Sequence, residues 1–524
     1  MTFASTPEPP SQPGPGEETP AVTAASSGRS RRAIVVGSVV GGLALLGGAG
    51  AWAVTALGGG GAQPEDALPA STTAYLRVDL DPSAGQKINL LRLANKVPDL
   101  ADTLGVELGE GADLRQLVAE ALTASGECEV DYAADVEPWI GDRAAVAMLP
   151  GDPEPTGAFV VAVTDEDAAR TAIESGLGCG EGVAAEQIAF TAGYVVVTDE
   201  GVPAADVVAD AEQASLADAE QFSADLDALG DPGLVSFWAD AQALGELTQA
   251  SGTYGLVGTE AGAELAEYTS VFGSLRFTAN SVELVGYAGA TDKVLEPLRA
   301  EGRAPTADLP STTLAAATFA VAPDAIDTQW SQLTDTFAAA QGLGSVNVDA
   351  LVDLFATQYD IHLPGDLATL FGEQFLLAVD AAGLDDVTAV TGVQDVNVGL
   401  RTVGDADALQ DLADRLNVLI AQTGTDPLAT AGVDDGLVFA TNDDYAQSLA
   451  SGGDLGSSDA YRDVVDDDGA SSVLYVDLDG LVTVLQGAVG AAEPLEYLEP
   501  LRALGLTSTA TDDHAVFSLR VSFD

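Results

Sequence analysis

The sequence predicts an α+β protein in which an N-terminal transmembrane helix precedes two tandem homologous lobes. Each lobe is expected to be a mostly antiparallel sheet with helices packed on one face. Three observations predict this fold. An uncharged apolar segment lies near the N-terminus, a series of segments recurs later in the same order, and short β-branched segments alternate with amphipathic helical patterns.

The N-terminal part divides into a tail, an anchor and a linker. Residues 1–28 are rich in Pro, Ser, Thr and Gly and are expected to form a disordered cytoplasmic tail. In residues 29–57, three arginines precede the uncharged stretch Ala33–Leu57. As a helix that stretch would be about 37 Å long, enough to cross a lipid bilayer. The arginines then place the tail inside the cell and the chain after Leu57 outside. Residues 58–67 are expected to be a flexible linker.

A cleaved export signal is the alternative for this segment. Arg31 and Arg32 resemble a twin-arginine signal, and Ala51–Ala53 resembles a small-residue cleavage site. The apolar stretch is longer than a signal core, however, and Trp52 lies within the cleavage site. Both alternatives export the rest of the chain, so the sequence predicts a single-pass cell-membrane protein with an extracytoplasmic C-terminal part.

An internal repeat predicts the two lobes. The stretch LPASTTAYLRVDLDP at Leu68–Pro82 returns as LPSTTLAAATFAVAP at Leu309–Pro323, and four further segments recur in the same order. Five collinear matches at offsets between about 230 and 245 residues favour a duplicated domain. We expect lobe 1 at 68–298 and lobe 2 at 306–524, the second being an internal repeat of the first.

Composition restricts the partners and the redox state. The chain has 82 acidic and 19 basic residues, a net charge of -63, which excludes nucleic-acid binding because that needs a basic surface. The lipid bilayer is an expected partner only through Ala33–Leu57. Cys128 and Cys179 are expected to form a disulfide, since the predicted compartment is oxidising.

The candidate chemistry consists of acidic pairs. Asp79 and Asp81 lie in one strand pattern, and Asp477 and Asp479 in another, so alternation would send both carboxylates of a pair to one face. These four residues are candidates for a Ca2+ site or a general acid and base pair. The histidines, His362 and His514, are expected to be solvated loop residues. No other cofactor is predicted.

The segment LPASTTAYLRVDLDPSAGQK at Leu68–Lys87, behind an anchor and a Pro-rich tail, resembles an actinobacterial membrane-anchored family, domain of unknown function 3352. The similarity would cover about 68–524. Membership implies an exported envelope protein without an assigned activity and supplies no catalytic residues.

The sequence therefore predicts an envelope protein whose duplicated acidic ectodomain binds or scaffolds an unknown ligand or partner, with no catalytic or cofactor-binding residues assigned. The cleft between two lobes would be the natural ligand site. One alternative is an exported hydrolase that uses paired carboxylates. Another is a wall or adhesion protein stabilised by cations.

Overall fold

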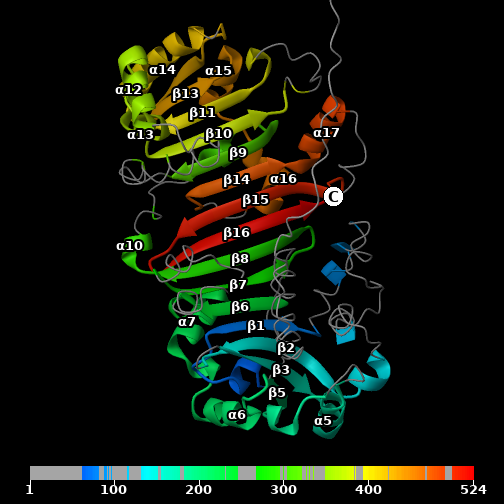
Figure 1. Cartoon of the computed structure of the whole chain (residues 1–524). Helices are drawn as coiled ribbons and strands as arrows, with labels where there is room; N and C mark the ends of the chain where they lie inside the picture. The colour runs from blue at the N-terminus through cyan, green and yellow to red at the C-terminus, as the bar shows by residue number, and fades with distance from the viewer. Residues whose placement is uncertain are drawn as a thin grey trace, which may run out of the picture.

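The dominant feature of the molecule is one antiparallel sheet of sixteen strands (Figure 1). The structure, a computed structural model, describes residues 62–81, 131–176, 182–245, 267–295, 304–320, 348–382, 393–465, 469–489 and 498–524. A few positions inside these ranges are not described, and a few isolated residues outside them are described as well. The described part holds both predicted repeats, so their arrangement can be read directly.

We call the two sets of eight strands half 1 and half 2. The strands of half 1 are β1 Ala74–Asp79, β2 Ile140–Leu149, β3 Thr156–Val163, β4 Ile188–Thr191, β5 Tyr194–Thr198, β6 Val235–Asp240, β7 Tyr268–Phe277 and β8 Ser281–Ala290. The strands of half 2 are β9 Thr313–Ala320, β10 Gln374–Asp380, β11 Val398–Val403, β12 Ala429–Val433, β13 Gly436–Ala440, β14 Ser472–Asp477, β15 Leu501–Ala510 and β16 His514–Phe523.

The two halves have the same topology. Half 1 runs β8-β7-β6-β1-β2-β3-β5-β4 across the sheet, and half 2 runs β16-β15-β14-β9-β10-β11-β13-β12. The register agrees in detail, because the irregularity between Tyr268 and Ser270 in β7 recurs 233 residues later between Leu501 and Ala503 in β15. Equivalent positions can therefore be paired residue by residue.

The halves meet where β8 pairs with β16. Ser518 lies opposite Val285 in this antiparallel pairing, and 285 and 518 also differ by the 233 residues that relate the two hairpins. The two strands at the junction are thus related by a pseudo-two-fold axis at this pair. A symmetric homodimer interface has the same geometry.

The predicted fold class is wrong in three respects. The repeats do not form separate lobes, because β8–β16 pairing joins them into one continuous sheet. Helices pack on both faces of that sheet rather than on one. The transmembrane helix is not supported, since no helix among the described residues is long and apolar enough to cross a membrane. The stretch Ala33–Leu57 itself lies outside the described residues.

Alternation along the strands produces two apolar faces. Face A, which carries Val160 and Tyr475, is covered by α6 Ala204–Gln213 and α7 Glu220–Leu229 in half 1 and by α15 Asp443–Ser451 and α16 Asp459–Val464 in half 2. Face B, which carries Val161 and Phe439, is covered by α5 Glu166–Glu174 in half 1 and α14 Ala406–Ala421 in half 2. The remaining helices are α10 Asp292–Leu295, α12 Val348–Tyr359, α13 Gly365–Phe371 and α17 Leu478–Val489.

Side-chain caps define where these helices begin. Asp165 accepts from the Ala168 backbone N–H at the start of α5, and Asp405 accepts from the Asp407 and Ala408 backbone N–H groups at the start of α14. An acidic cap satisfies free N–H groups and opposes the positive end of the helix dipole. The same device therefore starts the equivalent helix in each half.

Part of the predicted linker belongs to the folded body. Residues Pro64–Ala67 form a 3-10 helix, η1, in which Glu65 and Ala67 are buried. The equivalent helix of half 2 is η7, Pro305–Asp308, which comes 241 residues later and connects the two halves. The composition of 58–67 resembles a spacer, but the apolar contacts of Ala67 and Leu68 fix its second half to face A.

Candidate functional site

The predicted acids Asp79 and Asp81 lie at the end of β1. Asp79 lies at the end of β1, where its Oδ1 accepts the backbone N–H of Asp81 at 3.1 Å and closes a turn. Burial raises the pKa of the Asp79 carboxyl. Asp81 lies beyond the strand and is exposed. The carboxylate of Asp79 is thus used locally, by the backbone that follows β1.

Asp477 and Asp479 have a similar explanation. Asp477 ends β14 and caps α17, because its Oδ1 accepts the backbone N–H of Gly480 at 3.0 Å. Burial also raises the pKa of the Asp477 carboxyl, whereas Asp479 lies in the first turn of α17. Six strand spacings of about 4.8 Å separate β14 from β1, so the two acidic pairs lie roughly 29 Å apart.

The structure offers no support for a metal site at these residues. Among the described residues, no group of three or more His, Cys, Asp or Glu side chains could hold a metal ion. Cys128 and Cys179 lie outside the described part, so their disulfide stays a prediction. The described residues therefore do not favour a cation site at the predicted acids.

His514 is more enclosed than the sequence suggests. It begins β16, lies edge-on against the rings of Phe272 and Tyr287, and has its Nε2 3.4 Å from the buried carboxylate of Asp225. Asp225 also accepts a hydrogen bond from the Trp238 indole at 2.7 Å. This contact links half 2 to α7 of half 1. His362, by contrast, is exposed as expected.

A buried polar cluster fastens η1 to half 1. Tyr75 Oη donates to Glu65 Oε2 at 2.5 Å, and Arg77 Nη1 lies 3.8 Å from Glu65 Oε1. At the equivalent positions of half 2, Thr306 and Thr318 share a hydroxyl hydrogen bond of 2.8 Å. Because a neutral pair makes the same connection in half 2, the cluster in half 1 has a structural role.

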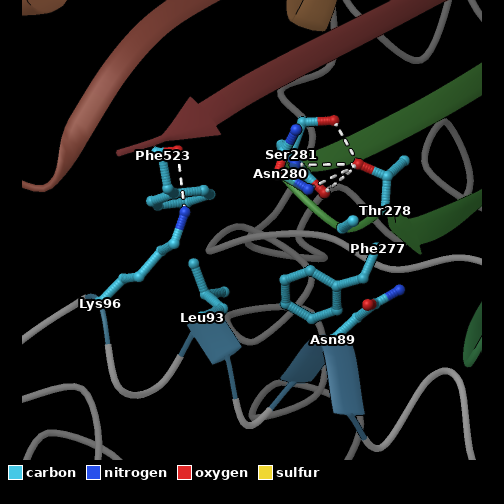
Figure 2. Close-up of a pocket in the computed structure, with 9 residues that line it drawn as sticks. Asn89, Leu93, Lys96, Phe277, Thr278, Asn280, Ser281 and Phe523 are labelled. Carbon is cyan, nitrogen blue, oxygen red and sulfur yellow. Dashed lines mark hydrogen bonds between the residues drawn. The ribbon is translucent and has the colours of Figure 1, made fainter.

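A small, shallow hollow lies between Asn89, Leu93 and Lys96 on one side and the turn joining β7 to β8 on the other (Figure 2). Leu93, Phe277 and Phe523 supply apolar walls, and Lys96 donates to the Phe523 carbonyl at 3.1 Å. The Thr278 hydroxyl is engaged within the turn, where it accepts the Ser281 backbone N–H at 2.9 Å. The hollow is small, and these polar groups are already bonded within the chain.

The best candidate site is an exposed apolar group on face B of half 2, which we call the aromatic patch. It consists of Phe319 in β9, Phe371 at the end of α13, and Phe375 and Leu377 in β10. Ring centroids are 5.5 Å apart for Phe319 and Phe375 and 4.6 Å apart for Phe371 and Phe375. Phe319 and Leu377 are each 43% exposed.

Strand register explains why these side chains share a face. Phe375 pairs with Phe319 across the β9–β10 ladder, and Leu377 lies two residues further along β10 on the same face. The intervening residue, Leu376, points to face A and is buried in its core. Strand β10 thus presents apolar side chains to both faces. Leu376 is buried on face A, whereas Leu377 is exposed on face B.

The equivalent surface of half 1 is more covered than that of half 2. In the β1–β2 ladder, Val78 pairs with Ala144 as Phe319 pairs with Phe375, and Val146 occupies the place of Leu377. Ala144 is 7% and Val146 6% exposed, and the core that contains Ala144 is completed by Trp139. Half 2 therefore carries larger apolar side chains where it is less covered, a difference the shared fold does not require.

Sequence reasoning missed this patch because an apolar run such as QFLLAV is typical of a strand buried on both faces. Only the difference in size between Phe375 and Ala144 at matching repeat positions could have indicated it.

Comparisons with known proteins add no identity. No family model matches the chain, and a comparison with curated proteins gives no match. One solved structure, described as "Structure of crystal form I of TP0453", matches with 10% sequence identity and a TM-score of 0.22. The match covers 45% of this chain and 86% of that chain, and a likeness at this level carries no argument.

Proposed function

We propose that this chain is a binding or scaffolding protein that acts without catalysis and contacts its partner through the aromatic patch. The observation that carries the proposal is the contrast between the halves: Leu377 is 43% exposed where the matching Val146 is 6% exposed, and the exposed Phe319 is larger than the half-buried Val78 that matches it. Large apolar side chains gathered on a surface mark interaction sites, because water disfavours their exposure.

The two alternative functions have less support. A carboxylate-pair hydrolase requires two acids that share one site, and Asp79 and Asp477 lie on strands six spacings apart. A cation-stabilised protein requires converging oxygen ligands, and the acids at both places serve as turn and helix caps.

The cellular setting stays a prediction of the sequence. The extracytoplasmic location and the bilayer contact depend on residues outside the described part, and the resemblance to domain of unknown function 3352 has no family match beside it. The proposed binding surface does not depend on any of them.

Binding of the neutral apolar dye Nile red to the full-length chain tests the proposal. We expect its fluorescence to rise with the wild type and to lose most of that rise in the Phe319→Ser/Leu377→Ser variant. Val418→Ser is the matched control, because Val418 is 63% exposed on α14 and outside the patch.

An unchanged signal in the double variant, or an equal loss in the Val418 control, would contradict the proposal. Circular dichroism checks that each variant is folded. If the double variant does not fold, Leu377→Ser alone provides the same test, since it leaves the three phenylalanine rings in place.

A further inference from the structure

The surroundings of the aromatic patch are strongly acidic. Figure 1 shows α12, α13 and α14 grouped beside β10 and β11 at one end of the sheet. Seven exposed carboxylates lie on these elements and the segments joining them. They are Asp353, Asp360, Glu373, Asp405, Asp407, Asp411 and Asp414. Glu373 lies between the patch residues Phe371 and Phe375 in the chain and is exposed.

Positive charge at this end of the sheet is already paired. Arg415 donates two hydrogen bonds to the carboxylate of Asp366, at 2.6 and 2.8 Å. Arg401 lies 3.2 Å from Asp435. In the described parts of β9 to β11 and α12 to α14, these are the two basic side chains, and each has an acidic partner. Arg415 also attracts Asp360 and Asp411, but two arginines cannot balance seven exposed carboxylates, so these elements keep a net negative charge.

The carboxylates on α14 are arranged in a row. Asp407, Asp411, Asp414 and Val418 follow one another at intervals of four, three and four residues, which places them on one side of a helix. The opposite side, with Leu409, is buried against the sheet. The row thus faces outward along the length of α14, and an apolar side chain lies at its end.

From the patch and its charges together we infer the chemistry of the partner: a basic amphipathic polypeptide segment, with apolar side chains on one side and Lys or Arg on the other. This inference rests on the proposed function and specifies the partner of the same surface. Apolar side chains would cover Phe319 and Leu377, while basic ones would meet the exposed carboxylates. An anionic membrane or a nucleic acid would be repelled by the same charges.

The arrangement predicts how association depends on salt. Exposed charge pairs contribute mainly to steering and are screened within about 10 Å at 0.1 M salt, whereas apolar contact is screened little. Binding should therefore weaken as salt is added, without disappearing.

Two synthetic helices with the same pattern of leucines, one with lysine and one with glutamate at the polar positions, test the inference. Fluorescence anisotropy measures their binding to the full-length chain. We expect the lysine peptide to bind and the glutamate peptide not to bind. The Asp407→Asn/Asp411→Asn/Asp414→Asn variant should bind the lysine peptide about tenfold more weakly.

The matched control is Asp206→Asn/Asp210→Asn/Glu212→Gln, which removes the same number of exposed charges from α6 in half 1. It should leave the affinity unchanged. If it weakens binding as much as the α14 variant, only net charge matters and the inference is overturned. Equal binding of both peptides, or binding to anionic phospholipid vesicles in place of the lysine peptide, also overturns it.

The Nile red assay distinguishes failure of the proposed binding surface from failure of the proposed partner chemistry. If the dye responds to the patch but the lysine peptide does not bind, the partner chemistry is wrong and the proposed function stands. If the Phe319→Ser/Leu377→Ser variant retains both dye and peptide binding, the patch is not the binding surface and both fail.

Discussion

The ion pair at the junction of the halves provides the sharpest test of the pseudo-symmetric arrangement. Glu283 in β8 faces Arg520 in β16, and its Oε1 accepts from Arg520 at 3.1 and 2.9 Å and from the Ser518 hydroxyl at 2.8 Å. The Glu283 side chain is 7% and the Arg520 side chain 15% exposed. On the other side of the axis, the equivalent pair is Val516 with Tyr287, so the chain contains its own neutral replacement.

Glu283→Val removes the carboxylate that the largely buried Arg520 guanidinium contacts, which should lower the free energy of unfolding by about 3–5 kcal/mol. Arg520→Tyr should also destabilise, because Glu283 loses the two hydrogen bonds that Arg520 donates to its carboxylate. The double variant copies the Val516–Tyr287 pair, and replacing a buried ion pair with apolar groups of similar volume is often neutral or stabilising. We therefore expect it to lie within about 1 kcal/mol of wild type.

Urea denaturation of the wild type, the two single variants and the double variant completes a double-mutant cycle. The account predicts a coupling energy of about 3 kcal/mol or more between the two positions. If the single effects add to within about 0.5 kcal/mol, the two side chains do not depend on each other and the assigned junction is wrong.

Three further predictions concern half 2. A Cβ at Gly505 would lie 2.4 Å from a backbone oxygen at the end of α16, so Gly505→Ala should cost about 1–3 kcal/mol. Gly432→Ala, with open space around it, should be nearly neutral, and urea denaturation of both variants checks the difference. The Arg415 hydrogen bonds lower the pKa of Asp366, so Asp366→Asn should cost about 2 kcal/mol at pH 7. That difference should shrink as pH falls below about 4 and through the lowered pKa; a constant difference would contradict the assignment. Burial raises the pKa of Asp477, so Asp477→Asn, which keeps a capping oxygen, should be more stable than wild type at pH 7. This gain should vanish below about pH 4, where the wild-type carboxyl is protonated in both states, and a gain that persists there would refute the burial argument.

The strands were predictable because each carries its own pattern. The segments AYLRVDL, GAFVVAV, GYVVVTD and LVSFWAD are short and rich in β-branched or aromatic residues, and they form β1, β3, β5 and β6. The repeat also indicated which segments of the two halves correspond, since alternation and turn residues are local properties that survive duplication.

The junction was not predictable from such patterns. Strands β8 and β16 look alike whether they are free edges or paired with each other, because alternation does not specify a neighbouring strand. The contacts that join them, Glu283 with Arg520 and Asp225 with His514, connect residues more than two hundred positions apart. Only coordinates bring such side chains together.

The candidate site was missed for a related reason. The acids Asp79 and Asp477 attracted attention by their charge, yet their carboxylates are held by the turn and helix that follow. The aromatic patch has no motif. Its signal is an exposure that depends on which elements cover face B, and residue spacing does not report it.

Hydrogen exchange at β8 and β16 tests most directly whether the two repeats form one sheet. The account predicts that amides in Ser281–Ala290 and His514–Phe523 exchange as slowly as those of the central strand β1, and that the edge strands β4 and β12 exchange faster. If β8 and β16 exchange like the edges, each half ends at its own free strand, and the single-sheet account is contradicted.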